Sequence, residues 1–337
     1  DSLAITDHGN MFGAIEFYIA AQKAGIKPII GCEVYIAPGS RLEKSAQGIE
    51  EASYHFILLA RDETGYGNLM KLVSIGYLEG FYYRPRIDKQ ILAQYSKGLI
   101  GMSSCLKGEI PVLIQVNRFN DALKTADELT QILGKGNFYL ELQENGIPEQ
   151  KTVNWGLLKI AKELSLPLAA TADVHYLTKE NAAAHEALLC IQTQTTLDDP
   201  NRMKFQTTEF YFKTPEEMKL LFREVPEAIK NTVDIASRCN LELDFSKVHL
   251  PKYDPPGGKD KEEFLKELCT DGLKKRFKEV TPSIEERLEH ELKIITQTGF
   301  ASYFLIVWDF IHYAKQNNIP TGPGRGSSAG SLVSYLL

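Results

Sequence analysis

The sequence of 337 residues lacks the features that mark membrane and secreted proteins. No apolar run reaches the roughly 18–20 residues that a helix needs to span a bilayer, and the densest, FLIVW at 304–308, is soon interrupted by Asp309 and His312. No basic segment followed by an apolar stretch resembles a signal peptide. The five cysteines are scattered, odd in number and without a CxxC pair, which favours reduced thiols over a disulfide framework. We therefore expect a cytoplasmic protein that does not enter a membrane.

A large excess of charge of one sign is also missing. The formal net charge of −6 argues against a protein that coats DNA with its whole surface. A local basic groove stays compatible with it, because phosphate contacts depend on local clusters. The length allows two domains, or one large barrel with an appendage. Because the chain opens on Asp1 and ends within the apolar run LVSYLL, we expect both ends to be cut from a longer protein.

The first half contains an alternation of strand-like and helix-like segments. Strands are expected at 2–7, 27–37, 55–60, 98–103, 138–143 and 167–174. Amphipathic stretches lie between several of them, at 11–24, 118–133 and 149–164. Such alternation is typical of parallel β/α units.

Side chains that can bind metal fall at the ends of these strands. They come from TDH (6–8), CE (32–33), YH (54–55), SC (104–105) and DVH (173–175). A β/α barrel builds its active site at the carboxyl ends of its strands, and imidazole, carboxylate and thiolate groups suit zinc, manganese and iron. Strand alternation would place Asp173 and His175 on one face. The pattern favours a metal site.

Each of these residues alone has a plainer interpretation. A single His or Asp at a strand end is usually a hydrogen-bonded polar residue, and Cys105 alone is typical of a small buried apolar residue. The histidines at 185, 290 and 312 fall within helical patterns and are expected to be surface or packing residues. Only the number of competent residues at strand ends favours the metal interpretation.

The second half changes in texture. Residues 190–250 are mixed, with helices expected at 215–223 and 226–238. PKYDPPGGKDK (251–261) is rich in proline, glycine and charge, and is the best linker candidate. Amphipathic helices are expected after it, at 262–278, 283–298 and 301–317.

The segment GPGRGSSAG (322–330) is not a Walker A loop, because no Gly-Lys-Ser/Thr follows it. Such a string alone is often a flexible turn. Its glycines also let a backbone approach a ligand closely, and successive N–H groups can form an anion nest. A helix beginning at SSAGSLVSYLL would add its positive end, and Arg325 would add a charged fork. A phosphate-binding loop is therefore one interpretation.

Long ordered strings resemble a known family over nearly the whole chain. The strings of the first half are TDHGNMFG, GCEVYIAPGSR, YHFILLARDETGYGNLMKLVS, EGFYYRPRID, CLKGEIP and TADVHYL. LCIQTQTTLDDPNRMKF, VHLPKY, GFASYFLIVWDFI and GPGRGSSAGSLV follow. Together they resemble the bacterial DNA polymerase III alpha subunit family, beginning in its PHP (polymerase and histidinol phosphatase) domain.

The resemblance implies a PHP-type distorted β/α barrel followed by the beginning of an α+β polymerase palm domain. The implied boundaries are 1–250 for the PHP domain, 251–261 for a linker and 262–337 for the start of the palm. The implied Zn²⁺ or Mn²⁺ ligands are His8, Glu33, His55, Cys105, Asp173 and His175, with Asp7 as a ligand or a supporting carboxylate. The family's HxH pair and a further acidic residue would precede Asp1.

The resemblance also implies template-directed DNA synthesis by the parent protein with Mg²⁺, on a primer-template and dNTPs. The implied partners are the sliding clamp, the proofreading subunit and the clamp-loader subunits. Arg325, Gly326 and Ser327 would contact the incoming nucleotide. The catalytic palm aspartates would lie beyond residue 337, so this chain alone is expected to be inactive in synthesis. For the PHP metal site, a 3′→5′ nuclease and a structural role both stay open.

Two alternatives come from other classes of protein. A free-standing PHP phosphoesterase, such as a histidinol phosphatase, would account for residues 1–190 but not for VHLPKY or GPGRGSSAGS. A scaffold module without enzymatic activity would keep the metal for structure only. Metal content and phosphatase activity distinguish these alternatives.

Overall fold

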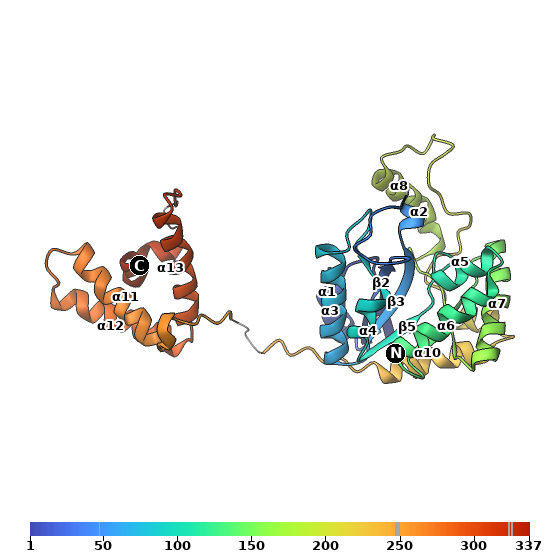
Figure 1. Ribbon diagram of the computed structural model, residues 1–337, viewed down its shortest axis with the longest axis horizontal. Coiled ribbons are helices and arrows are strands. Elements are labelled where there is room, and N and C mark those ends of the chain that lie inside the picture. The colour runs from blue at the N-terminus through green and yellow to red at the C-terminus, as the bar shows by residue number, and fades with distance from the viewer. Residues whose placement is uncertain (47, 247–249, 323, 325) are drawn as a thin grey trace. The chain divides into compact units, whose positions relative to one another are not determined.

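The computed structural model describes residues 1–46, 48–246, 250–322, 324 and 326–337. The chain divides into two compact units, Asp1–Leu243 and Asp244–Leu337, each with its own apolar core. Figure 1 shows strands and helices in the first unit, whereas the described residues of the second form helices only.

The first unit is built on a curled sheet of seven strands in the order β1–β2–β3–β5–β6–β7, with β4 also paired to β2. The PHP-type distorted β/α barrel expected from the sequence is therefore confirmed, and all six expected strands are present. The strands are β1 (Ser2–Ile5), β2 (Lys27–Ile36), β3 (Tyr54–Ala60), β4 (Arg86–Ile87), β5 (Leu99–Met102), β6 (Phe138–Gln143) and β7 (Leu168–Thr171).

Helices surround the sheet, and Figure 1 shows α1 and α3 to its left and α5, α6 and α7 to its right in this view. Two of them begin where an aspartate side chain caps a free backbone N–H, Asp62 at α3 and Asp88 at α4. The helices of this unit are α1 (Ala14–Lys23), α2 (Ile49–Ala52), α3 (Glu63–Leu78), α4 (Lys89–Gln94), α5 (Glu109–Gln115), α6 (Phe119–Leu133), α7 (Pro148–Leu164), η1 (Lys179–Asn181), α8 (Ala182–Thr193), α9 (Pro215–Leu221) and α10 (Pro226–Arg238).

The expectation of parallel units throughout is wrong for β3. This strand pairs antiparallel with β2 and with β5, while the β1–β2, β2–β4, β5–β6 and β6–β7 pairs are parallel. Among the described residues between β2 and β3, the only helix is the four-residue α2. A parallel crossover needs a dozen or more residues, usually with a full helix. Because β3 is reversed, its first residues lie at the edge where the other strands end.

Side chains alternate between two apolar layers on the two faces of the sheet. On β3, Phe56 and Leu58 join the larger layer together with residues of α3, α5, α6 and α7. Ile57 and Leu59 join the smaller layer, which also contains Ile235 of α10. Strands buried on both faces are nearly continuous in apolar residues, as β2 and β6 are here. A charged residue within such a strand therefore has a cost and needs partners.

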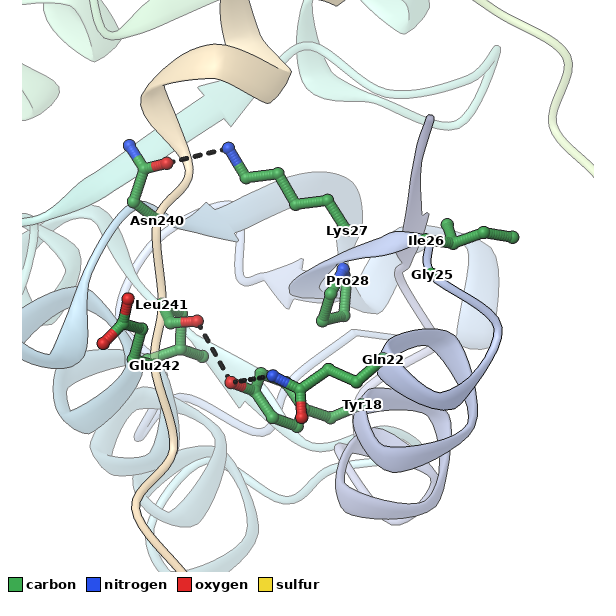
Figure 2. A pocket seen from close by; sticks show the side chains of 9 residues that line it. All are labelled: Tyr18, Gln22, Gly25, Ile26, Lys27, Pro28, Asn240, Leu241 and Glu242. Carbon is green, nitrogen blue, oxygen red and sulfur yellow. Dashed lines mark hydrogen bonds between the residues drawn. The ribbon is translucent and has the colours of Figure 1, made fainter.

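After α10 the chain passes back beside α1 at the edge where β2 begins. Tyr18 donates its hydroxyl hydrogen to the carbonyl of Leu241 at 3.4 Å, and the Lys27 ammonium donates to Asn240 Oδ1 at 2.8 Å. A hollow of about 550 Å³ lies between these segments, and Figure 2 shows the side chains that line it. Lys27 begins β2, so this hollow lies at the edge opposite the one where the strand ends.

The second unit is a group of short helices around a small core that includes Leu265, Cys269, Leu305 and Val333. Its helices are η2 (Pro256–Gly258), α11 (Lys261–Arg276), α12 (Pro282–Gln297), α13 (Ala301–Gln316), η3 (Gly326–Gly330) and α14 (Leu332–Leu336). Within the part of the chain that the structure describes, no single helix has the length and apolar composition to cross a membrane, although α12 and α13 together pass as a pair bent by 112°.

Candidate metal centre

Glu33 is the centre of the site, and the register of the sheet explains its neighbours. Residues Glu33 and Ile57 face each other across β2 and β3, as do Tyr35 and His55. Directly opposed side chains point to the same face, so Glu33 and His55 are diagonal neighbours there. Glu33 Oε1 lies 2.6 Å from His55 Nδ1 and accepts a hydrogen bond from Ser104 Oγ at 3.0 Å.

The Glu33 carboxylate is buried, and burial by itself raises its pKa. The hydrogen bond from His55 and the nearby His8 ring outweigh that effect, so the pKa of Glu33 lies below its ordinary value. The carboxylate is therefore ionised at neutral pH within a largely apolar surrounding. A buried anion with this arrangement is favoured further by a bound cation.

His8 enters from the loop that follows β1. The backbone N–H of Gly9 donates to the carbonyl of Glu33 at 2.9 Å, which extends the β1–β2 pairing past the end of β1. His8 Nε2 lies 3.8 Å from Glu33 Oε1. Ligand atoms of His8, Glu33 and His55 all lie within 4.8 Å of one another. Burial lowers the pKa of His8, so its imidazole is neutral at pH 7 and has a lone pair for a metal.

Cys105 lies against the same pair of residues. Its Sγ is 4.0 Å from Glu33 Oε1 and 3.8 Å from His55 Nδ1. Burial, followed by the charges of Glu33 and Asp173, raises the pKa of the Cys105 thiol well above its ordinary value. The thiol is thus protonated beside these carboxylates and would lose its proton on binding a metal, which deprotonates a coordinating thiol.

Asp173 and His175 form a pair beside this cluster. The His175 and His8 rings are 6.2 Å apart between centroids, and His175 Nδ1 lies 3.8 Å from Asp173 Oδ1. The pKa of Asp173 is raised to about 6, mainly by burial, while the nearby His175 lowers it and Glu33 raises it.

The geometric reason that the sequence suggested for the Asp173 and His175 pair is wrong. The strand ends at Thr171, and Asp173 has a left-handed φ of 50°, so strand alternation does not orient the two side chains. The Nδ1 of His175 lies 2.8 Å from the Asp173 carbonyl. A histidine that donates one ring nitrogen to a carbonyl keeps the other free as a metal ligand.

Asp7 supports the site through its backbone. Its carbonyl accepts hydrogen bonds from Glu33 N at 3.0 Å and from Cys32 Sγ at 3.3 Å. Its carboxylate lies near Gly13, just before α1. The Asp7 contribution that the structure shows is therefore to hold the start of the site loop against β2.

Sequence reasoning missed Glu141, a buried residue of β6. Its Oε2 accepts a hydrogen bond from Ser104 N at 3.1 Å, and its Oε1 accepts from Gln143 Nε2 and Thr171 Oγ1. Burial raises the pKa of Glu141 to about 7, against these hydrogen bonds and with the help of the charges of Glu33 and Asp173. The signal for it was a charged residue inside the apolar strand FYLELQ.

Glu141 gives a prediction for the pH dependence of stability without metal. A carboxyl whose pKa is raised by folding stabilises the fold fully below its unfolded pKa, and this stability is lost as pH rises through about 7. With chelator present, we expect the free energy of unfolding to fall by about 2–3 kcal/mol more in the unaltered chain than in Glu141→Gln, from about pH 5 to about pH 8. Urea denaturation measures this, and parallel pH profiles would contradict it.

His185 has more contacts with the site than the sequence suggested. Its ring lies 5.6 Å from the His175 ring and 4.9 Å from the Phe205 ring, between centroids. Burial lowers the pKa of His185, and the neighbouring His175 lowers it further. His185 is thus a packing residue in an aromatic cluster, and this cluster lies next to the candidate metal centre.

The glycine-rich segment of the second unit is described in part. Arg325 lies outside the described residues, and Gly326 has a left-handed φ of 67° at the start of η3. Ser327 belongs to the same 3-10 turn. The idea that the following helix presents free N–H groups to phosphate is wrong for α14, because Leu332 N and Val333 N already donate to the Glu291 carboxylate at 3.1 and 3.0 Å.

The chemistry of the donors fits a transition-metal site. Three imidazoles, two carboxylates and one thiol converge from segments far apart in the sequence, and each is a recognised ligand of zinc or of a related ion. Glu33, Asp173 and Cys105 are all buried or half-buried. Acidic groups brought together in this way repel each other without a cation between them.

Comparisons with known proteins agree with the fold. Residues 1–145 match the PHP domain family, and residues 263–337 match the family described as the bacterial DNA polymerase III alpha NTPase domain. The DNA polymerase III subunit alpha of Borreliella burgdorferi is 50% identical over 99% of the chain and 29% of its own length. Those of Treponema pallidum and Thermus aquaticus are 46% and 40% identical over the whole chain, and over 29% and 32% of their own lengths.

The fold and the site thus define a PHP-domain protein with a candidate metal site. The matches run through both units, and the chain belongs to the family of bacterial DNA polymerase III alpha subunits. It spans about three tenths of the length of the relatives reported above.

Proposed function

We propose that the first unit is a metal-dependent phosphoesterase within a replicative DNA polymerase alpha subunit, acting as a 3′→5′ nuclease. The observation that carries this proposal is the convergence of His8, Glu33 and His55 ligand atoms within 4.8 Å of one another. Cys105 and the pair Asp173–His175 lie beside them. Zn²⁺ or Mn²⁺ is the cofactor, held by His8, Glu33, His55, Cys105, Asp173 and His175, with Asp7 in support.

The residues of the proposed site have different roles. Glu33 and Cys105 hold the inner side, where burial excludes water from the ligands. His8 lies at the mouth, with 42% of its side chain exposed, and faces an incoming phosphoester with a neutral imidazole. Bound metal ions would polarise the phosphoryl group and lower the pKa of a water molecule. His175 is oriented by the Asp173 carbonyl, so its free nitrogen points consistently.

The test of this proposal is metal content together with hydrolysis. We expect the unaltered chain to retain Zn²⁺ or Mn²⁺ after dialysis and to hydrolyse bis(p-nitrophenyl) phosphate. The double variant Asp173→Ala/His175→Ala is expected to lose most of the metal and the activity, because two of the proposed ligands are removed. Elemental analysis and absorbance of released nitrophenol measure both. Equal metal in the two proteins would refute the ligand assignment, and metal without hydrolysis would favour a structural role.

For the parent protein we propose template-directed DNA synthesis in chromosome replication. Support comes from relatives named DNA polymerase III subunit alpha that align over the whole chain. On this proposal residues 1–250 are the PHP domain, 251–261 a linker and 262–337 the start of the palm. Arg325, Gly326 and Ser327 contact the incoming nucleotide. The synthesis uses Mg²⁺ and a primer-template. The parent protein binds the sliding clamp, the proofreading subunit and the clamp loader.

A cytoplasmic location belongs to the same proposal, and the five free cysteines support it. The alternative of a free-standing PHP phosphoesterase is set aside, since such an enzyme would not carry the second matched family at 263–337.

A further inference from the structure

The loop that joins α3 to β4, residues 79–85, lies directly beside the metal centre. A Cβ atom on Gly9, the residue after His8, would come within 2.9 Å of Pro85 Cγ and of Tyr35 Cε2. The Arg84 guanidinium lies 5.8 Å from the centre of the Tyr35 ring, and that ring lies 6.2 Å from the His8 ring between centroids. The loop is therefore part of the mouth of the site.

Three aromatic side chains stand exposed on this loop and the helix end before it. Tyr77, Phe81 and Tyr83 are 42%, 49% and 51% exposed. The Tyr77 and Phe81 rings stack with centroids 6.2 Å apart. Exposed aromatic rings beside a phosphoester site offer surfaces on which bases can stack. We call Tyr77, Phe81, Tyr83 and Arg84 the aromatic platform.

Tyr83 combines a strained backbone conformation with an exposed ring. Tyr83 has a left-handed φ of 60°, which a bulky residue adopts rarely and with backbone strain. The neighbouring Tyr82 turns inward, where its hydroxyl donates to the carbonyl of Ala46 at 2.7 Å. The Tyr83 ring stays outside, 4.6 Å from the Tyr82 ring between centroids. Glycine or asparagine would hold this turn more easily, so the retained ring points to a use for it.

Arg84 supplies the charge that an anionic strand requires. Its guanidinium lies 5.8 Å from the centre of the Tyr35 ring. Among the residues that the structure describes, no carboxylate forms an ion pair with Arg84. A planar guanidinium held over a ring and free of acidic partners is suited to bidentate contact with phosphate.

The platform is held in place from behind by a buried cation. Arg86, 2% exposed, donates hydrogen bonds to the carbonyls of Gly80, Ala52, Arg41 and Glu43 at 2.7–3.2 Å. These bonds tie the loop to the segment between β2 and β3. A binding surface fixed before its ligand arrives loses less entropy on binding.

We propose that the aromatic platform binds single-stranded nucleic acid and leads its end to the metal centre. Bases would stack on Tyr83, Phe81 and Tyr77, and a phosphate next to the reactive one would contact Arg84. This inference rests on the proposed phosphoesterase function and specifies its substrate as an unpaired polynucleotide end rather than a small phosphomonoester. Paired bases are already stacked on each other, so a duplex cannot use the platform in this way.

The test measures binding without metal, so that it does not depend on hydrolysis. Fluorescence anisotropy of a labelled short oligothymidylate, at low salt and with chelator, gives the dissociation constant of the whole chain. We expect Phe81→Ala/Tyr83→Asn to bind at least about 25-fold more weakly, since it removes two base–aromatic stacks and each is worth about fivefold or more in the dissociation constant. Arg84→Gln should weaken binding and reduce its dependence on salt, and Arg84→Lys should restore part of it.

The matched control lies on α7, where Lys159 Nζ sits 3.3 Å from the centre of the Trp155 ring and Trp155 is 60% exposed. Trp155→Ala and Lys159→Gln remove an exposed aromatic ring and an exposed cation, and are expected to bind the strand as the unaltered chain does. Unchanged melting temperatures confirm that each variant is folded.

A second measurement locates the strand on the protein. An oligonucleotide containing 5-iodouracil is irradiated with the chain, and the cross-linked peptide is identified by mass spectrometry. Cross-links to Phe81 or Tyr83 support the proposal. Cross-links found only elsewhere, equal affinities for platform and control variants, or tighter binding of the corresponding duplex would overturn it. If the unaltered chain binds at the platform but hydrolyses no phosphoester with Mn²⁺, the proposed enzymatic function fails while the binding surface stands.

Discussion

A Glu33→Gln variant should bind Mn²⁺ at least about 100-fold more weakly than the unaltered chain. Loss of a residue that merely supports a metal ligand already costs 10–100-fold in affinity, and Glu33 has a more central position. Its Oε1 lies 2.6 Å from His55, 3.0 Å from Ser104, 3.8 Å from His8 and 4.0 Å from Cys105. Glutamine keeps the volume and removes the charge that a cation needs.

Isothermal titration of metal-free protein with Mn²⁺ measures this effect. Glu128→Gln is the control, because Glu128 pairs with Lys89 at 2.7 Å on the outside of the barrel and lies in no proposed site. Its affinity for Mn²⁺ should equal that of the unaltered chain. Equal affinity of Glu33→Gln and Glu128→Gln would show that the metal, if bound, lies elsewhere.

Two glycines of α3 should respond to alanine in opposite directions. A Cβ on Gly65 would come within 1.9 Å of the backbone oxygen of Gly98, whereas nothing lies within 4 Å of a Cβ on Gly67. Gly65→Ala must therefore push α3 away from the turn before β5, and we expect a loss of about 3 kcal/mol in the free energy of unfolding. Gly67→Ala should gain about 0.5–1 kcal/mol, because alanine is the better helix former.

Urea denaturation followed by circular dichroism checks both glycine variants against the unaltered chain. The second unit carries neither substitution, so its transition is an internal reference. A Gly65→Ala protein as stable as Gly67→Ala would mean that α3 does not approach Gly98 as closely as the structure has it.

The positions of the strands and of the proposed ligands were accessible from the sequence because both follow from local patterns. Apolar runs of a few residues bounded by turns predict strands, and HFILLA and FYLELQ became β3 and β6. His8 and His55 were found because reactive residue types stand at the ends of such runs, and Glu33 because a charged residue stands inside one. The structure brings their ligand atoms together.

The direction of β3 was not accessible, because a strand has the same pattern whichever way it runs. His55 precedes the apolar part of its strand, and only the reversal of that strand carries it to the edge where β2 ends. Glu141 was missed for a related reason. The Glu141 carboxylate accepts hydrogen bonds from Ser104, just after β5, and from Thr171 at the end of β7. Such contacts between distant segments leave no mark on local spacing.

Two sequence predictions were wrong: that strand alternation orients Asp173, and that the N–H groups at the start of α14 are free for phosphate. A left-handed φ at Asp173 ends the strand early, and no apolar pattern reports a single backbone angle. In the second unit, Glu291 on α12 reaches Leu332 and Val333 across about forty residues of sequence. Helix periodicity gives the face of α12 but not the partner that its carboxylate finds.

The reversal of β3 also sets the electric field at the mouth of the site. In a regular β/α unit the following helix begins at the edge where the strands end and so turns its partial positive charge there. Here α3 leaves from the far edge and returns, which brings its carboxyl end to Tyr77 and the loop before Arg86. The partial negative charge of about half an electron at a helix carboxyl end favours cations. Arg84 lies in the loop that follows this helix end, and Pro85 beside it lies close to Gly76 in the last turn of α3, so the helix end favours the positive charge of the loop.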